Sequence, residues 1–263
     1  MKKQEAETQA LATVGTVALA SVEEATKDSA EDLALNQQFE QADLRLPQMK
    51  VCQSMTPQRK RSDPNFIPNL AEGDLFNDAS AAIYGQGPLR FVMLKFWTNF
   101  IKFKPVEQGG GILSRGIRGE DGLVRDEAGK ILNTEFGPSG EKPEVTKFMN
   151  YLFYLVDTQE IVWFSAKSTA LSVMRQFHTS LRGVQGIADY RKVFTISTAS
   201  AKNAAQQEYA VPVIPKKPVG IIPADSELAK ALRKMTSDLA DKNIDTSAAE
   251  TTDSEQSTED VPF

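Results

Sequence analysis

The chain of 263 residues contains one cysteine and one histidine, and this scarcity excludes several kinds of site. Cys52 has no partner for an internal disulfide and no second thiolate for a cysteine-based zinc site. His178 has no second histidine for an HExxH metal site, and alone it suits a helix surface or a packing position. We therefore expect no bound metal and no cofactor, and a fold that is stable by packing alone in the reducing cytoplasm.

Long apolar runs and catalytic motifs are also missing. No stretch reaches the roughly 18 apolar residues that a membrane-spanning helix needs, so we expect no membrane partner. The glycine run 109–111 is not followed by the lysine of a phosphate-binding GxxxxGK[ST] loop. No pair of carboxylates stands beside a lysine at the spacing of a nuclease site. We predict that the protein is not an enzyme and has no catalytic residues.

Charge is distributed unevenly along the chain, which has a net charge of -5. Residues 1–44 contain 3 lysines and arginines against 9 acids, and residues 236–263 contain 1 lysine against 8 acids. Residues 45–235 contain 26 lysines and arginines against 18 acids. A basic middle between acidic ends is typical of a polyanion-binding protein with interaction tails.

Composition and periodicity divide the chain into three parts. Residues 1–44 predict an acidic, mostly disordered segment, 45–223 a folded core, and 224–263 a short helix with an acidic disordered tail. In the core we predict a hairpin over 74–77 and 81–85, and loops over 53–73 and 105–149. The remaining strands are predicted over 46–52, 89–103, 150–156, 160–167, 190–198 and 207–214.

A helix is predicted between the strands 160–167 and 190–198. Leu171, Met174, Phe177 and Leu181 recur at helical spacing, Ser165 or Ser168 would cap the helix, and Gly183 would end it. The order strand, long loop, strand, strand, helix, strand, strand is that of an oligonucleotide/oligosaccharide-binding (OB) barrel. We therefore predict a mainly β, OB-like fold with one or two helices, in which the loop 105–149 forms part of the binding surface.

Aromatic and basic residues alternate along the strand 89–103, a pattern that suits single-stranded nucleic acid because rings stack on unpaired bases and cations contact phosphates. If the strand is regular, one face holds Phe91, Met93, Trp97 and Ile101, and the other holds Leu94, Phe96, Phe100 and Lys102. The sequence does not decide which face is the core. The predicted DNA-binding residues are Lys95, Phe96, Trp97, Phe100, Lys102, Phe103, Lys104, Arg115, Arg118, Tyr151, Tyr154, Trp163, Arg191 and Lys192.

The last residues form the most specific motif. Glu259, Asp260, Val261, Pro262 and Phe263 resemble the tail of bacterial single-stranded DNA-binding proteins, which ends in Asp-Asp-Ile-Pro-Phe. A terminal phenylalanine would present a ring and a carboxylate together to a pocket that has an apolar hole and a cation. The resemblance implies that these five residues bind partner proteins of replication or recombination.

The core is similar to a family of phage single-stranded DNA-binding proteins. The similar segments are LPQMKVCQSMTP, EGDLFN, FSAKSTAL, VFTIST and YAVPV, which together span most of residues 45–215. The resemblance implies a protein of phage DNA replication, recombination or repair in the host cytoplasm. Two alternatives remain open: a recombination mediator or annealing protein, and an adaptor or structural phage protein that does not bind DNA. The sequence does not decide between a monomer and a homo-oligomer.

Overall fold

The computed structural model describes residues 47–108, 110–135, 137–138, 141–202, 206–240 and 244. All of them belong to one compact unit, Arg45–Phe263. The predicted disordered segment 1–44 and the predicted docking motif 259–263 lie outside the described residues.

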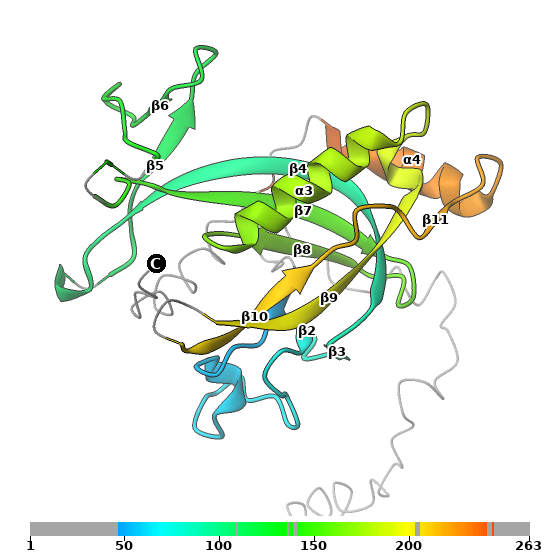
Figure 1. Cartoon of the computed structure of the whole chain (residues 1–263), viewed down its shortest axis with the longest axis horizontal. Helices are drawn as coiled ribbons and strands as arrows, with labels where there is room; N and C mark the ends of the chain where they lie inside the picture. Colours follow the sequence, from blue (N-terminus) through cyan, green and yellow to red (C-terminus); the bar gives the residue numbers. More distant parts are fainter. Residues whose placement is uncertain are drawn as a thin grey trace, which may run out of the picture. The chain divides into compact units, whose positions relative to one another are not determined.

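Five strands and one helix follow the order expected for an OB-like fold (Figure 1). β4 (Leu89–Phe103), β7 (Thr146–Leu155) and β8 (Ile161–Ala166) form an antiparallel meander. After the helix, β9 (Lys192–Lys202) pairs with the other edge of β4, and β10 (Glu208–Val213) pairs with β9. The predicted strand 89–103 is confirmed at both ends.

Four shorter strands extend this arrangement. β1 (Gln48–Val51) lies parallel to β8 and antiparallel to β2 (Leu75–Asn77), which forms a hairpin with β3 (Ile83–Gly85). β11 (Gly220–Ile221), which we did not predict, pairs with β9. Figure 1 shows that the sheet curls into a half-barrel, so the predicted fold class, mainly β with two helices, is confirmed. Short 3-10 helices occupy Pro57–Arg59, Val106–Gln108 and Asp189–Arg191.

A side chain joins β10, at one end of the curled sheet, to the segment that follows β1. Gln53 Nε2 donates to the carbonyl oxygen of Ala210 at 2.8 Å, and Gln53 Oε1 accepts from the amide of Ala210 at 2.9 Å. The primary amide of Gln53 therefore pairs with the backbone as a peptide group of a neighbouring strand would.

Gln53→Ala should lower the free energy of unfolding by about 1–3 kcal/mol, because it leaves the amide and carbonyl of Ala210 without their partner. Gln53→Glu is a second test, since it keeps an acceptor for the Ala210 amide but sets a charged carboxylate oxygen against the Ala210 carbonyl, and it should also lower stability. Chemical denaturation measures both variants. Equal stability of wild type and Gln53→Ala would show that this contact does not stabilise the fold.

The helix α3 (Ala170–Gly183) covers one face of the sheet. Its buried residues Met174, Phe177 and Leu181 recur at intervals of three and four, and they pack on Phe91 and Phe194. The predicted helix and its end at Gly183 are confirmed, but its predicted caps are wrong. Ser165 belongs to β8, Ser168 has a positive φ, and Thr169 precedes the helix without a side-chain capping bond.

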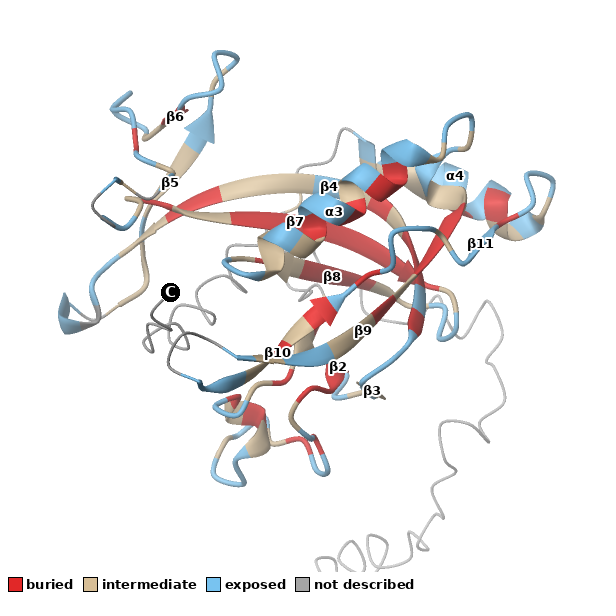
Figure 2. Cartoon of the chain, in the orientation of Figure 1, coloured by how far each residue is buried: buried red, intermediate tan, exposed pale blue. Residues whose placement is uncertain are grey.

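The helix α4 (Glu227–Ala240) covers the opposite face and confirms the short helix predicted near 225–240. Its buried residues Ala229 and Leu232 pack against Leu152 and Trp163. Figure 2 shows that the buried residues concentrate on β4, β7, β8 and β9, between the two helices. The sheet is therefore buried on both faces over much of its length, which explains why its strands are apolar at consecutive positions.

Because β4 contains a β-bulge, its side chains divide between the two faces of the sheet differently from the prediction. The pairing with β7 shifts register between Met93 and Lys95, so the alternation of side chains reverses there. Phe96 consequently lies opposite Tyr151 on the α3 side, and Trp97 packs on the α4 side. The expectation that Trp97 shares a face with Phe91 and Met93 was wrong, because it assumed a regular strand.

The segment 105–149 is also more ordered than the predicted loop. β5 (Ile112–Arg118) pairs with the distal half of β4, and β6 (Val124–Arg125) pairs with β5. A small core under this hairpin consists of Phe100, Val124, Leu132 and Val145. The glycine-rich and charged composition of this segment indicated a loop. The strand β6 has only two residues and the ends of the hairpin are rich in turns, so apolar and polar residues hardly alternate there.

Candidate nucleic-acid interface

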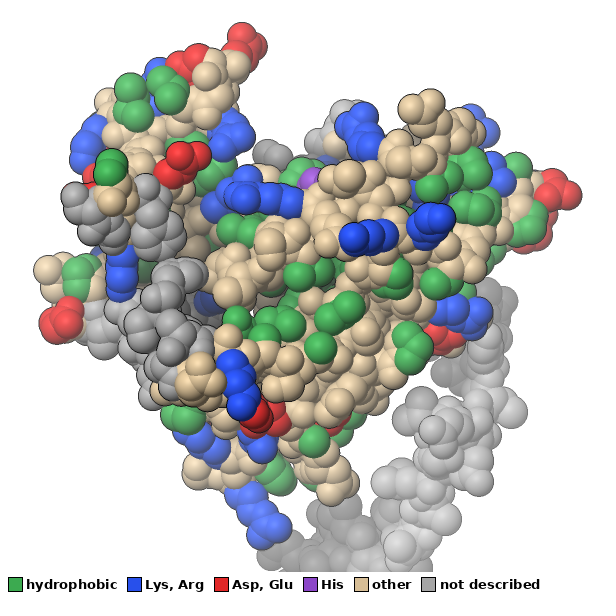
Figure 3. Space-filling view, in the orientation of Figure 1, with side chains coloured by type: hydrophobic (Ala, Val, Ile, Leu, Met, Phe, Trp, Pro, Cys, Tyr) green, Lys and Arg blue, Asp and Glu red, His purple; other side chains and the backbone are tan. Residues whose placement is uncertain are grey.

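Cations from three elements lie near one another beside α3, on the same side of the sheet as the exposed ring of Phe96. We call this site the basic hollow and define it by Phe96 of β4, Arg118 of β5, Lys147 of β7, and Arg175 and His178 of α3. Figure 3 shows blue side chains gathered in a hollow between α3 and the β5–β6 hairpin.

Strand register brings the cations of the sheet together. On β4, Phe100 lies between Lys147 of β7 and Gly116 of β5. Arg118 follows Gly116 on the same face of β5, and its guanidinium carbon lies 5.0 Å from the centroid of the Phe100 ring. The guanidinium of Arg118 therefore packs over the buried ring of Phe100, and Lys147 is the residue paired with Phe100 on β7.

Phe96 supplies the exposed ring of the basic hollow. The bulge turns it toward α3, where its centroid lies 5.1 Å from that of Tyr151 and 4.6 Å from that of His178. The His178 ring meets it edge-on, with an interplanar angle of 83°. Phe96 remains 38% exposed, so its position is fixed by neighbours while part of the ring faces solvent.

The basic hollow has a strong excess of positive charge. In the described part of the chain, no carboxylate lies within ion-pair distance of Arg118, Lys147 or Arg175. Burial, followed by the nearby Arg118 and Arg175, lowers the pKa of Lys147. Three cations that repel one another without a counter-charge form a site that an anion would stabilise.

His178 joins this electrostatic environment from α3. Its Nε2 lies 2.9 Å from the hydroxyl of Tyr151. Burial raises the pKa of Tyr151, so this hydroxyl stays protonated, and the tautomer of His178 decides which of the two groups donates. Burial also lowers the pKa of His178, and Lys147 and Arg182 lower it further, against a smaller opposite effect of Asp189.

In the free protein, the pKa of His178 should therefore lie below the roughly 6.5 of an unperturbed histidine. Because the unfolded chain then binds the proton more tightly than the folded chain, this group should lower stability as the pH falls below about 6.5. NMR titration of the single imidazole measures the pKa, and His178→Gln should remove this part of the pH dependence. A pKa above that of a model histidine would contradict the described environment.

Three of the predicted DNA-binding cations instead hold the fold together. Lys95 Nζ donates to the carbonyl oxygens of Leu239 and Ala240 at the end of α4, at 2.5 and 3.1 Å. Lys192 is buried and donates to the carbonyl of Leu181 at 2.7 Å, near the end of α3. Cations stabilise helix ends through the unpaired carbonyls there. Arg191 Nε similarly donates to the carbonyl of Ile222 at 2.8 Å.

Most of the predicted stacking rings lie in the core. Phe100, Tyr151, Tyr154 and Trp163 are each at most 8% exposed, and Trp97 is half-buried against the α4-side core. The four buried rings are not accessible to a base in this fold, whereas part of Trp97 remains exposed. The sequence pattern predicted the aromatic strands correctly. It did not predict which of their rings are buried in the core and that Phe96 is exposed.

The other predicted residues lie around the distal half of β4. Lys102 pairs with Glu144 at 3.6 Å, and Phe103 lies against Phe148 with centroids 6.1 Å apart. Lys104 is exposed, and Arg115 is half-buried. Of the predicted set, Phe96 and Arg118 form part of the basic hollow.

Sequence reasoning missed Lys147, Arg175 and His178. Arg175 was not among the predicted DNA-binding residues, and His178 had been expected at a helix surface or a packing position. One signal was available: no aspartate or glutamate occurs between Ile161 and Ala188, so α3 has cations without counter-charges. Lys147 had no such signal, because its role depends on the register between β4 and β7.

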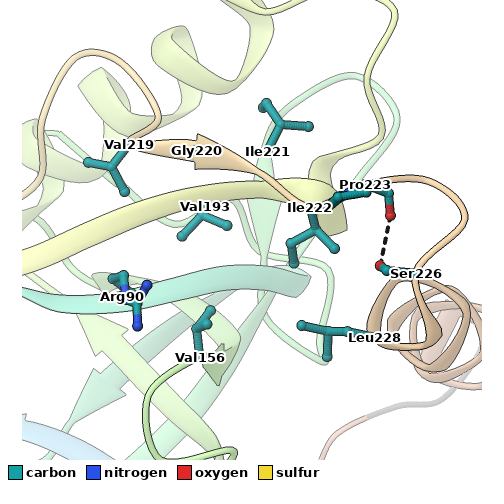
Figure 4. A pocket seen from close by; sticks show the side chains of 10 residues that line it. All are labelled: Arg90, Val156, Val193, Val219, Gly220, Ile221, Ile222, Pro223, Ser226 and Leu228. Atoms are coloured by element: carbon teal, nitrogen blue, oxygen red, sulfur yellow. Dashed lines mark hydrogen bonds between the residues drawn. The ribbon is translucent and has the colours of Figure 1, made fainter.

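A separate pocket of about 360 Å³ lies between β11, the start of α4 and the start of β4 (Figure 4). Its lining is mainly aliphatic, including Val193, Val219 and Ile222. Its only charged side chain, Arg90, donates from Nε to Asp157 at 2.8 Å. This pocket suits an apolar side chain and not a phosphate.

Within the described ranges, no three metal-ligating side chains lie together. Among the helices that the structure describes, none combines the length and apolarity of a membrane span.

Comparison with curated proteins and with solved structures gave no match. The model of a family described as Pam3 phage gp34-like protein matches residues 14–245, which is most of the chain. The expected phage origin is confirmed at this level, and the chain belongs to the Pam3 phage gp34-like family.

Proposed function

We propose that this chain binds single-stranded DNA in the basic hollow and acts in phage DNA replication, recombination or repair in the host cytoplasm. The observation that carries the proposal is the grouping of Arg118, Lys147 and Arg175, without a nearby carboxylate in the described chain, on the side of the sheet where His178 meets the exposed ring of Phe96. Cations and an accessible ring together match a strand with phosphates and unpaired bases.

The partly covered ring of Phe96 favours a single strand over a duplex. Phe96 packs against Tyr151 and edge-on against His178 of α3, and it is 38% exposed. A base reaches such a ring only when it is unstacked and turned away from a partner strand.

Binding of fluorescent oligo-dT and of a duplex of equal length tests this proposal. We expect tighter binding of the single strand, with an affinity that falls steeply as salt is added, because bound cations release counterions from the DNA. Strand-annealing activity in the same assay would favour the mediator role over simple strand protection. Equal affinity for both DNA forms, or no affinity for either, would overturn the proposal.

We further propose that Glu259, Asp260, Val261, Pro262 and Phe263 recruit replication or recombination proteins. The support is the sequence motif alone, in which acids precede an apolar residue, a proline and a phenylalanine.

Phe263→Ala should weaken partner binding by about 1.5–3 kcal/mol, the free energy of burying an aromatic side chain, without changing DNA affinity. Thr251→Ala in the same tail is the matched control. Pull-down from host lysate, followed by quantification of the captured proteins, measures the effect. Recovery of the same proteins by wild type and Phe263→Ala would show that this ring does not bind a partner.

An adaptor role is a second candidate, and one specific feature favours it. Leu113, Ile117, Leu123 and Ile131 of the β5–β6 region are 44–67% exposed. Strand alternation places Ile117 and Ile131 on one face, on either side of Arg125, opposite the small core under the hairpin. Failure of DNA binding together with intact folding would favour this second candidate.

A further inference from the structure

We propose that a single strand bound in the basic hollow continues across α3 to Lys216 and Lys217, so that the binding track has two segments. This inference rests on the proposed function and extends it by naming where the strand runs beyond the hollow. The ligand of the second segment is the phosphate backbone of the same strand.

The first observation is the charge of the chain from β8 to the loop after β11. Residues 161–224 contain eight lysines and arginines but only two acids, Asp189 and Glu208. Asp189 pairs with Lys192 at 2.8 Å, and Glu208 pairs with Lys202 at 3.3 Å. This stretch therefore has no carboxylate free to repel a phosphate backbone or to neutralise its remaining cations.

The second observation is the outer surface of α3. Its exposed residues recur at intervals of three and four, on the side opposite the buried Met174, Phe177 and Leu181. They are Ser172, Arg175, Gln176, Thr179 and Arg182, together with the terminal Gly183. Arg175 and Arg182 are seven residues apart, which corresponds to about 10 Å along a helix. A strand that leaves the hollow at Arg175 thus meets donors and a second arginine along α3.

The third observation is a pocket on the far side of α3. It has a volume of about 810 Å³ and is lined by Gln176, Thr179 and Gly183 of α3 and by Lys216 and Lys217. Both lysines are exposed, and among the described residues neither has a carboxylate partner. Figure 3 shows further blue side chains over the connection between β10 and β11.

Prolines hold this lysine pair in place. Pro215 and Pro218 flank Lys216 and Lys217, and the preceding Ile214 is buried in the α3-side core. Fixed proline φ angles reduce the backbone freedom that binding would otherwise remove. No aromatic residue lines this pocket, so the second segment should contact phosphates and not stack on bases.

Length-dependent binding to the full-length protein tests the two-segment track. Single OB folds contact about 4–16 nucleotides, so oligo-dT of about 5 nucleotides should fill the hollow alone and one of about 16 should reach both segments. The variant Lys216→Glu/Lys217→Glu removes the second segment. Arg233→Glu/Lys234→Glu on the exposed side of α4 is the control with the same change of charge.

We expect Lys216→Glu/Lys217→Glu to weaken the binding of the long oligonucleotide at least about tenfold. The slope of its affinity against salt concentration should fall by about 1.4, for two lost phosphate contacts on a single strand. The affinity for the short oligonucleotide should fall much less, and the control variant should lower both affinities only weakly. Equal losses for both lengths, or no loss for either, would overturn the two-segment track. A different result would contradict the proposed function itself: wild-type protein would not bind the short oligonucleotide, or Lys147→Ala would not weaken that binding.

Discussion

Replacing Arg118, Lys147 and Arg175 together by alanine should weaken the binding of oligo-dT by about 100–1,000-fold. Each charge-assisted contact with a phosphate contributes about 1.5–3 kcal/mol, and neighbouring contacts do not add in full. The loss should appear as a smaller dependence on salt, with the slope reduced by about 2 for three lost phosphate contacts on a single strand. Titration at several salt concentrations measures both quantities.

The stability of this triple variant should not fall, because it relieves repulsion among three cations that have no carboxylate partner in the described chain. The matched control removes three exposed cations elsewhere, Lys60, Arg61 and Lys234. If the control weakens binding as much as the triple variant does, net charge and not the basic hollow accounts for the affinity.

Two aromatic substitutions should have opposite consequences. Trp163→Ala should lower the free energy of unfolding by about 3–5 kcal/mol, because Trp163 is 1% exposed and its removal leaves a large cavity. Phe96→Ala should leave the protein folded and weaken DNA binding by about 1–3 kcal/mol, the usual contribution of a ring that stacks on a base. Thermal unfolding and oligo-dT titration of both variants separate the two effects.

Phe96→Leu is the control for the ring itself, because it keeps an apolar side chain that contacts Tyr151 but has no flat face. It should bind nearly as weakly as Phe96→Ala and be more stable. Unchanged DNA affinity of both Phe96 variants would remove base stacking from the account and leave a purely electrostatic site.

Much of the fold could be predicted because local patterns and tertiary packing agree. The strand Leu89–Phe103 is rich in β-branched and aromatic residues, and Met174, Phe177 and Leu181 mark the buried side of α3. The succession of strands with one intervening helix then suffices for the OB-like order. These features depend on residues that are close together in the sequence.

The faces of β4 could not be predicted for a physical reason. One extra residue between Met93 and Lys95 reverses every later side chain, and nothing in the local sequence marks that position. Trp97 therefore moved to the core on the α4 side and Phe96 to the basic hollow. The structural hydrogen bonds of Lys95 and Lys192 could not be predicted either, because their carbonyl partners at the helix ends lie far away in the chain or on another element.

The basic hollow itself is a product of long-range pairing. Lys147 is 29 residues from Arg118 and 28 from Arg175 in the sequence, and the three meet only through the register of β5, β4 and β7 and the packing of α3. The sequence predicted an interface of aromatic and basic residues on the strand 89–103, the loop 105–149 and the later strands. The structure divides that set into core rings, structural cations, and a smaller group that joins residues from other elements.

The pKa of His178 with and without bound oligo-dT shows whether single-stranded DNA binds in the basic hollow, because the chain has one histidine and it borders this site. Phosphates that approach Lys147 and Arg175 would offset the positive charge that disfavours imidazolium. We expect the pKa of His178 to rise on saturation with oligo-dT, and the affinity to increase correspondingly as the pH falls from about 7.5 to 5.5. Saturating binding that leaves the His178 resonance and its pKa unchanged would place the DNA outside the basic hollow.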